Sequence, residues 1–293
     1  MTGECPSGAH LLQEHQVRAI VTLTVLAAIT GCAAHNESSG WRAADVQTSP
    51  ESCSAQLGRN RHSQQHELDS SDIRIVNWNI QKGGDPDWAD DLSTFTNEPD
   101  LMIFQEAALD VDAWEIVAAG HYRSFAPGYR TRGTAGSVTG VMTLSAAEPM
   151  TSCSLVSIEP WLRSPKATMI TEYGLTDTDQ SLLVVNIHAI NFTIGIKDFR
   201  EQIRRALSVI SAHPGPILLS GDFNTWHWRQ SKMLRGMANN HGLTTLNYDE
   251  DHRKRVFGQP LDHIYIRGLH VIDATSIRLD SSDHNPMSAT LSL

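Results

Sequence analysis

Short apolar segments alternate with turn-rich stretches over most of the chain after residue 72. Ten segments have the length and apolar content of β-strands: 73–80, 101–104, 138–144, 155–158, 167–173, 182–188, 217–219, 261–266, 271–279 and 287–291. Four stretches have the amphipathic spacing of helices: 86–96, 111–119, 197–212 and 229–239. So many strands with few helices between them do not fit a simple series of parallel βαβ units. The pattern therefore predicts an α/β protein with two packed sheets and helices on the outside.

Polar side chains occur where several of these apolar strands end. Asn79 ends the strand 73–80, and Glu106 follows the strand 101–104. Asn186 and His188 share a face of their strand, because residues two apart on a strand point to the same side. A single instance is weak, since Asn and Asp are common in turns for local hydrogen-bonding reasons.

The same pattern returns in the last third of the chain. Asp222 and Asn224 stand two apart just beyond the strand 217–219. Asp262 begins an alternating strand, and Asp283 and His284 lie in a turn-rich loop before the last strand. Carboxylates, amides and imidazoles at so many strand ends favour one polar site at the rim of a pair of sheets.

The first seventy residues differ from the rest. The apolar run 19–29 is too short to span a bilayer as a helix but suits the core of a signal peptide. It ends in Ile29-Thr30-Gly31-Cys32, which resembles the lipobox of bacterial lipoproteins. The resemblance implies a leader over 1–31, lipidation of Cys32, and an anchored protein in the bacterial cell envelope that faces outside the cytoplasm. A short buried helix is the alternative that this run leaves open.

Composition narrows the class of protein further. Residues 32–71 are polar and have the composition of a flexible tether, which leaves 72–293 as one domain. Four cysteines in 293 residues are too few for a disulfide scaffold. Cys53 and Cys153 could pair in an oxidising compartment, but their spacing does not demand it, and we interpret both as incidental. The net charge of −10 argues against a strong non-specific coat of nucleic acid, yet allows carboxylates around a metal ion.

Six short motifs resemble those of the endonuclease/exonuclease/phosphatase superfamily, the metal-dependent phosphodiesterases related to DNase I. They occur in the family's order and span the whole of 72–293; Gly-Asp-Phe-Asn and Ser-Asp-His-x-Pro are the specific ones. The motifs are Asn77-Trp78-Asn79-Ile80, Phe104-Gln105-Glu106, Asn186-Ile187-His188, Gly221-Asp222-Phe223-Asn224, Leu261-Asp262-His263-Ile264 and Ser282-Asp283-His284-Asn285-Pro286. The surrounding sequence also resembles a bacterial, largely uncharacterised branch. The resemblance implies a four-layer α/β/β/α sandwich with two mixed sheets.

The resemblance also implies a metal site. Glu106 is the expected main ligand of a divalent cation, with Asn79 and Asp283 completing or supporting the site. Hard oxygen ligands of this kind suit Mg²⁺ or Mn²⁺ rather than Zn²⁺, which prefers nitrogen and sulfur.

The remaining motif residues are expected to act on the substrate. Asp222 resembles the residue that orients or deprotonates the attacking water, and Asn224 resembles an amide that orients the phosphate. His284 resembles the imidazole that contacts the scissile phosphate, and Asp262 resembles the carboxylate that holds this imidazole. His188 stands where some family members have a histidine and others a tyrosine.

Three functions stay open at this point. The resemblance favours a divalent-metal-dependent phosphodiester hydrolase, most plausibly a nuclease. A phospholipid hydrolase of the sphingomyelinase type or an inositol-phosphate hydrolase is the alternative, which the lipid anchor and the pair Trp226 and Trp228 favour slightly. A catalytically silent envelope protein that only binds is the third, because fold does not fix function. The substrate is thus a phosphodiester, with nucleic acid favoured and phospholipid second, and no obligate protein partner is implied.

Overall fold

A computed structural model describes residues 41–43, 48–59, 66–95, 98–131 and 137–293. The chain divides into two units, Met1–Ser38 and Ser39–Leu293, and the description below concerns the second. The predicted leader 1–31 and the lipidation site Cys32 lie outside the described residues. Over the described ranges, none of the helices combines the length and the apolar character that crossing a bilayer requires.

One sheet has seven strands, in the order β1-β4-β5-β3-β2-β15-β14. Strands β2 and β3 are parallel, and β15 runs antiparallel to β2. The strands are β1 (Trp41–Ala43), β2 (Ile73–Asn79), β3 (Leu101–Ala108), β4 (Tyr122–Arg130), β5 (Val138–Ser145), β14 (His270–Ser276) and β15 (Met287–Ser292).

A second sheet has six strands, in the order β10-β13-β9-β8-β7-β6. Strands β8 and β9 are parallel, and the other pairs are antiparallel. The strands are β6 (Thr151–Ile158), β7 (Pro165–Gly174), β8 (Ser181–His188), β9 (Ile217–Asp222), β10 (Thr244–Thr245) and β13 (Asp262–Arg267), and a separate hairpin is formed by β11 (Arg255–Val256) and β12 (Gln259–Pro260).

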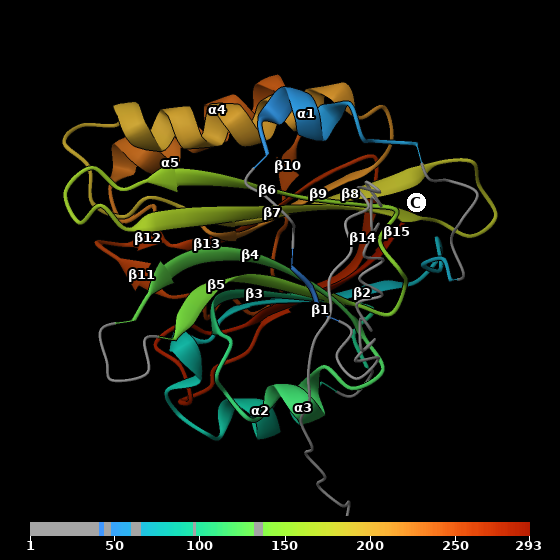
Figure 1. Ribbon diagram of the computed structural model, residues 1–293, viewed down its shortest axis with the longest axis horizontal. Helices are drawn as coiled ribbons and strands as arrows, with labels where there is room; N and C mark the ends of the chain where they lie inside the picture. The colour runs from blue at the N-terminus through green and yellow to red at the C-terminus, as the bar shows by residue number, and fades with distance from the viewer. Residues whose placement is uncertain (1–40, 44–47, 60–65, 96–97, 132–136) are drawn as a thin grey trace, which may run out of the picture. The chain divides into compact units, whose positions relative to one another are not determined.

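The helices lie outside the two sheets, which face each other (Figure 1). Helices α1 (Pro50–Ser54), α4 (Lys197–Ala212) and α5 (Trp228–Asn240) cover the six-stranded sheet. Helices α2 (Trp88–Asp91) and α3 (Trp114–Val117) cover the seven-stranded sheet, together with the short 3₁₀ turns η1 (Gln81–Gly83) and η2 (Leu92–Thr94). The layer order confirms the predicted α/β/β/α sandwich.

Each layer boundary contains its own apolar core. Between the sheets, strand residues such as Ile75, Val184 and Leu218 are buried together. Under α4, its Phe199 and Ile203 pack on the six-stranded sheet. Under α2 and α3, three large rings from Trp88, Phe104 and Trp114 pack with centroids 4.9–5.9 Å apart. The predicted helices 197–212 and 229–239 are confirmed, whereas 86–96 and 111–119 shorten to brief turns around the buried tryptophans.

The described part of the predicted tether is packed rather than free. Helix α1 begins after Ser49, whose hydroxyl accepts a hydrogen bond from the Ser52 N–H. Leu68 is buried and forms a bridge with Leu175 next to β7. The expectation of a flexible tether over 32–71 is therefore wrong for 48–59 and for 66–71.

A disulfide joins α1 to the six-stranded sheet. Cys53 in α1 is bonded to Cys153 in β6, and the two cysteines are 100 positions apart in the sequence. The interpretation of both cysteines as incidental is wrong, because long-range packing rather than sequence spacing brings them together. Both side chains are buried in the core under α4.

Candidate active site

Strand register brings three of the predicted residues side by side at one end of the six-stranded sheet. Asp222 ends β9, with His188 of β8 opposite it on one side and Asp262 of β13 opposite it on the other. Gly221 allows this close arrangement, because a Cβ at that position would clash with the backbone carbonyl of Ile187 in β8. The predicted convergence of the strand ends is thus confirmed for these three side chains.

The seven-stranded sheet contributes Asn79 and Glu106 to the same site. Asn79 ends β2 and lies opposite Gln105 of β3. A β-bulge then interrupts β3 between Gln105 and Ala107, and Glu106 adopts a left-handed backbone with φ of 51°. The bulge re-aims Glu106, whose Oε1 lies 3.9 Å from Nε2 of His188.

His284 enters the site from the loop between β14 and β15. The loop is fixed at its base, because Ser282 Oγ donates to the Asn79 carbonyl at 2.7 Å and Trp78 Nε1 donates to the His284 carbonyl at 2.8 Å. His284 is buried, whereas its neighbour Asp283 is exposed. The described contacts do not join Asp283 to the other site residues, so its predicted role as a metal ligand gains no geometric support here.

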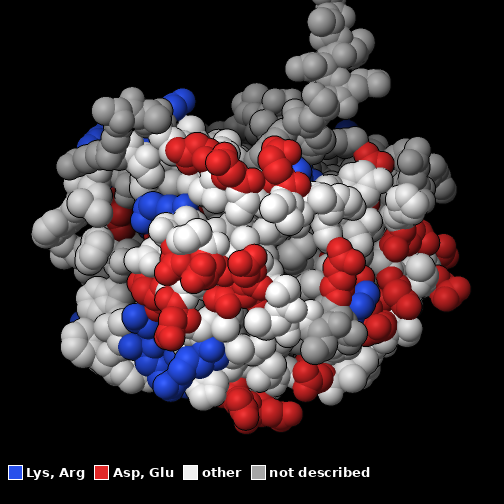
Figure 2. All heavy atoms as spheres, turned by 90° about the horizontal axis from the view of Figure 1, so that it is seen from below, with Lys and Arg blue, Asp and Glu red and all other residues white. Residues whose placement is uncertain are grey.

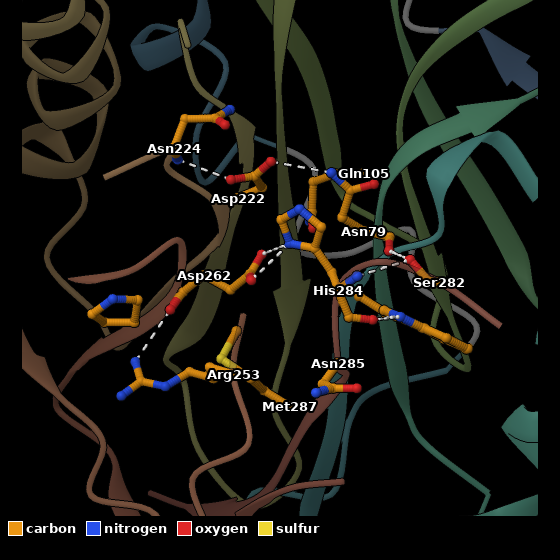
Figure 3. A network of polar contacts seen from close by, with 12 residues as sticks. Asn79, Gln105, Asp222, Asn224, Arg253, Asp262, Ser282, His284, Asn285 and Met287 are labelled. Atoms are coloured by element: carbon orange, nitrogen blue, oxygen red, sulfur yellow. Dashed lines mark hydrogen bonds and ion pairs between the residues drawn. The ribbon is translucent and has the colours of Figure 1, made fainter. Parts of the chain in front are cut away.

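His284 and Asp262 form a buried ion pair (Figure 3). Nδ1 of His284 lies 2.8 and 3.0 Å from the two carboxylate oxygens of Asp262. Burial alone would lower the pKa of His284, but the charge and hydrogen bond of Asp262, with the charge of Asp222, outweigh it and raise the pKa to about 10. The imidazole is therefore a cation at neutral pH and can donate from Nε2.

Asp222 lies beside this cation and is held by two donors. Its Oδ1 accepts from the Asn224 N–H at 2.8 Å, and its Oδ2 accepts from Asn79 Nδ2 at 3.1 Å. Burial raises the pKa of Asp222 to about 6, with the charge of His284 opposing and that of Asp262 adding to the shift. Asp222 can therefore accept a proton near neutral pH, as a general base requires. Asn224 also donates from Nδ2 to the carbonyl of Ala189, and this bond does not use its side-chain oxygen.

Two lysines lie at the site that the sequence did not identify. Lys82 Nζ lies 2.6 Å from Glu106 Oε2, and Lys166 Nζ lies 2.9 Å from Nε2 of His188. Burial, with the charge of Lys166, holds the pKa of His188 well below its usual range, so its Nε2 accepts the hydrogen bond from Lys166. Burial also lowers the pKa of Lys166. Lys82 was weighed as a phosphate contact but interpreted as a solvated lysine of the glycine-rich turn 81–84, and Lys166 stands just before the predicted strand 167–173.

A buried polar network supports the site from behind. Gln105 Nε2 donates to Asn77 Oδ1 at 3.0 Å and to Asn186 Oδ1 at 2.8 Å, and Ser220 Oγ donates to Asn77 Oδ1 at 2.8 Å. These side chains come from β2, β3, β8 and β9 and so connect the two sheets. Asn77, Asn186 and Ser220 each precede a site residue by two positions. The alternation of strand side chains therefore gave the signal that could have found this network.

Arg253 supports Asp262 from the hairpin side. Its guanidinium donates to the Asp262 carbonyl at 3.1 Å, pairs with Asp251 at 2.8 Å and stacks 4.5 Å from the centre of the Tyr248 ring. The mixed-charge run 249–255 was interpreted first as a solvated loop and second as a substrate clamp. Arg253 is instead half-buried and holds the backbone of Asp262.

The donor set of the site fits a hard divalent cation. Atoms of Asp222, Asp262 and His284 lie within 4.8 Å of one another. However, Nδ1 of His284 is bonded to Asp262, and a protonated imidazole cannot bind a metal. Glu106 and Asn79 offer oxygen donors of the type that Mg²⁺ prefers. In this structure Glu106 pairs with the ammonium of Lys82, which a bound cation would have to displace.

Comparisons with known proteins agree with this geometry. A sequence profile of the endonuclease/exonuclease/phosphatase family matches residues 76–284. A UPF0294 protein from Vibrio vulnificus is 33% identical over 222 residues, which cover 75% of this chain and 77% of that protein. The endonuclease/exonuclease/phosphatase from Beutenbergia cavernae has a similar fold, with a TM-score of 0.60, 17% identity, and coverage of 76% of this chain and 72% of that one. D. rerio TDP2, solved with a single-strand DNA product, gives a TM-score of 0.57 at 16% identity and covers 76% of this chain and 100% of its own.

Proposed function

Because this chain belongs to the endonuclease/exonuclease/phosphatase family, we propose that it is a divalent-metal-dependent phosphodiester hydrolase, and that its substrate is nucleic acid. The observation that carries the proposal is the convergence of Asp222, Asp262 and His284, from three separate segments, in one buried cluster. The DNA product in the structure of D. rerio TDP2 favours the nucleic-acid substrate.

In the proposed reaction Asp222 orients and deprotonates the attacking water. The two hydrogen bonds from Asn79 and Asn224 hold its carboxylate in one orientation, so that a water near either oxygen is also held. General-base catalysis of this kind typically contributes about 10²–10⁴-fold to the rate.

Cationic and neutral donors around Asp222 bind the phosphate. His284, kept protonated by Asp262, donates to a non-bridging oxygen as negative charge develops there. Lys166 adds a second positive charge next to His188 on the same rim. Glu106 and Asn79 would hold the divalent cation, which supplies Lewis acidity at a phosphate oxygen when bound.

A substrate panel tests this proposal. The purified full chain is assayed on plasmid DNA, single-stranded DNA, RNA, sphingomyelin and inositol phosphates, each with Mg²⁺, Mn²⁺ or EDTA. We expect metal-dependent cleavage of nucleic acid that Glu106→Gln and His284→Ala both abolish. Glu115→Gln and His270→Ala, which change exposed residues on α3 and β14, are the matched controls and should retain it. Nuclease activity that survives in Glu106→Gln or His284→Ala would contradict the proposal.

A phospholipid substrate is the second candidate, and one observation favours it. Trp228, the first residue of α5, is 57% exposed and follows Asp222 by six positions in the chain. Turnover of sphingomyelin but not of nucleic acid in the same panel would favour this candidate. Absence of metal-dependent turnover on every phosphate ester would favour a silent binding protein.

We also propose that Cys32 is lipidated and anchors the chain at the outer side of a bacterial membrane. The Cys53–Cys153 disulfide supports an oxidising compartment, because such bonds seldom persist in the cytosol. Cys32→Ser should move the protein from the membrane fraction to the soluble fraction. Unchanged partitioning in this variant would rule out the anchor.

A further inference from the structure

Large apolar side chains project into solvent from four loops at one end of the sandwich. The loops are the β6–β7 turn, the β8–α4 loop, the β9–α5 loop with the first residue of α5, and the tip of the β11–β12 hairpin; Figure 1 shows the β6–β7 turn and the hairpin at the left-hand end of the sheets. Six of the ten exposed large apolar side chains in the described ranges lie on them. We call these six the apolar rim: Trp161, Leu162, Phe192, Ile194, Trp228 and Phe257.

Contacts between the loops make the apolar rim one surface. Glu159 Oε1 accepts from the N–H groups of Asn191 and Phe192 at 2.9 and 2.7 Å, which joins the first two loops. Trp226 Nε1 donates to Asn191 Oδ1 at 3.0 Å, which joins the third loop. The rings of Trp226 and Phe257 lie 6.4 Å apart, which joins the hairpin.

The apolar rim adjoins the proposed catalytic site. A cavity of about 310 Å³ is lined by Phe192 and Phe257 of the rim, by Trp226, and by Asn224 of the site. A surface that contacts the apolar rim would therefore lie beside Asn224 of the proposed site.

The backbone at Phe257 is strained, and its ring points into solvent. The two-residue tip of the hairpin, Phe257 and Gly258, has φ of 50° and 78°. Turns of this geometry favour Asn-Gly, because a bulky side chain is strained at positive φ. The chain nevertheless places an aromatic ring there with 83% of its surface exposed, which indicates a use for the ring outside the fold.

The charges around the apolar rim are basic. The loops and the residues that flank them carry Arg163, Lys197, Arg229, Lys254 and Arg255, against a buried Glu159 and a half-buried Asp198. Arg255 also pairs with Asp251 at the base of the hairpin. The face covered by α2 and α3 differs: Figure 2 shows several clusters of acidic side chains on it, with fewer basic ones at the lower left. Exposed acids near these helices include Asp85, Asp87, Asp90, Asp110, Asp112 and Glu115.

We propose that the apolar rim docks onto the surface of an anionic lipid bilayer. Apolar tips interspersed with Lys and Arg are the composition of interfacial membrane-binding surfaces, where the tips enter the head-group region and the cations meet anionic lipid. Leu162 and Ile194 are aliphatic and cannot stack on nucleobases, which argues against a platform for single-stranded nucleic acid. The inference does not depend on which phosphodiester is hydrolysed.

Local fluorescence quenching tests the docking directly. The full chain is mixed with vesicles of phosphatidylcholine and phosphatidylglycerol in equal parts, whose acyl chains carry bromine. Phe257→Trp should raise the fraction of tryptophan emission that the vesicles quench. Ile116→Trp is the matched control, because Ile116 is 81% exposed on α3 in the acidic face, and the added emission should escape quenching. Equal quenching of the two added tryptophans, or quenching of neither, would overturn the proposal, and the readout is local enough that an N-terminal anchor cannot imitate it.

Partitioning gives a second, independent readout. In a Cys32→Ser background, which removes the proposed anchor, Phe257→Ser should weaken binding of the full chain to the same vesicles about tenfold, the usual effect of losing one buried large apolar side chain. In the same background Ile116→Ser should leave binding unchanged. An emission change of Phe257→Trp with a single-stranded oligonucleotide but not with vesicles would assign the surface to nucleobases and overturn the proposal. Self-association that Phe257→Ser abolishes, without vesicle binding, would assign it to a second copy of the chain and would also overturn it. Because neither readout involves turnover, failure here is distinct from failure of the proposed hydrolase function.

Discussion

Asp262 keeps the imidazole of His284 charged although water hardly reaches either side chain. Only 8% of the His284 side chain and 1% of the Asp262 side chain are exposed. In such surroundings an isolated imidazole would lose its proton, so the cation depends on its partner. The proposed donation to the phosphate depends on this pair more than on any other contact in the site.

Asp262→Asn should therefore reduce catalysis while the fold survives. The variant keeps a hydrogen-bonding side chain but lacks the charge, and kcat/KM on the best phosphodiester should fall about 10²–10⁴-fold. Asp273→Asn, at an exposed position of β14, is the control. Adding His284→Ala to Asp262→Asn should cost little more, because the two residues act as a unit. Wild-type kcat/KM in Asp262→Asn would contradict the assignment.

His263 gives a pH dependence of stability that is separate from catalysis. Burial, with the charge of Arg253 adding to it, lowers the pKa of His263 from 6.5 to about 3. The unfolded chain therefore binds a proton that the folded chain excludes. The free energy of unfolding should fall as the pH is lowered from about 6.5 towards 3, by up to about 1.4 kcal/mol per pH unit.

Urea denaturation at pH 7 and pH 5 measures this contribution. The wild type should lose more stability between the two values than His263→Gln, which cannot titrate. His270→Gln changes an exposed histidine and should behave as the wild type. Equal losses in the wild type and in His263→Gln would show that burial of His263 does not oppose its protonation.

At the scale of elements, the close approach of β8 and β9 decides where Asp222 and His188 meet. Gly221 permits that approach and has φ of 150°. Gly221→Ala should force the two strands apart, lower stability by several kcal/mol and abolish activity, because backbone atoms cannot move aside cheaply. Gly236→Ala is the matched control: Gly236 lies in α5 with open space around it, and the change should stabilise the helix by about 1 kcal/mol. Thermal unfolding and activity measure both, and a stable, active Gly221→Ala would contradict the account.

The disulfide between α1 and β6 should stabilise the fold by restricting the conformations of the unfolded chain. A bond that closes a loop of 100 residues is expected to stabilise by about 2–5 kcal/mol. Reductant should lower the denaturation midpoint of the wild type to that of a Cys53→Ser, Cys153→Ser variant, which reductant itself should not affect. A midpoint insensitive to reductant would show that the bond does not constrain the chain.

Helices and strands were predicted well from the sequence where the apolar positions of the local pattern are also the positions that pack in the folded core. Helix α4 has a continuous apolar face, and its predicted bounds 197–212 agree with the structure. Strand β4 was missed because Pro127 and Gly128 interrupt its pattern, and its pairing with β5 holds it in the sheet instead. Helices α2 and α3 were predicted too long, because Trp88 and Trp114 need only one turn each to reach the core.

At the scale of the whole molecule, the sequence grouped correctly those site residues that strand pairing places next to one another. His188, Asp222 and Asp262 could be grouped from the sequence because each ends or begins a strand. Lys166 was not grouped with the site because it stands before the predicted strand 167–173, although the pairing of β7 with β8 places it beside His188. Arg253 was not grouped because the hairpin that returns the chain to Asp262 was not predicted. The Cys53–Cys153 bond was missed because its cysteines are 100 positions apart and only tertiary packing brings them together.

The charge distribution of the whole molecule predicts a weak salt dependence on nucleic acid. The net charge is −10, and the face shown in Figure 2 is mainly acidic. With few phosphate contacts available, kcat/KM on DNA should fall less than about tenfold between 50 and 200 mM salt, whereas a protein with many such contacts loses about 10³–10⁵-fold in affinity. Activity measured over this range checks the expectation, and a much steeper loss would reveal a basic track for the substrate.

The order of the strands along the chain has a consequence for biosynthesis. The six-stranded sheet is built from one continuous stretch, β6 to β13, whereas the seven-stranded sheet needs β15 to return and pair with β2 near the start. The imidazole of His284 arrives with that returning segment. A nascent chain that emerges from the ribosome in order therefore carries Glu106 and Asp222 for some time without the imidazole proposed to bind the phosphate. For the proposed hydrolase, this order implies that turnover begins only after the late segment docks.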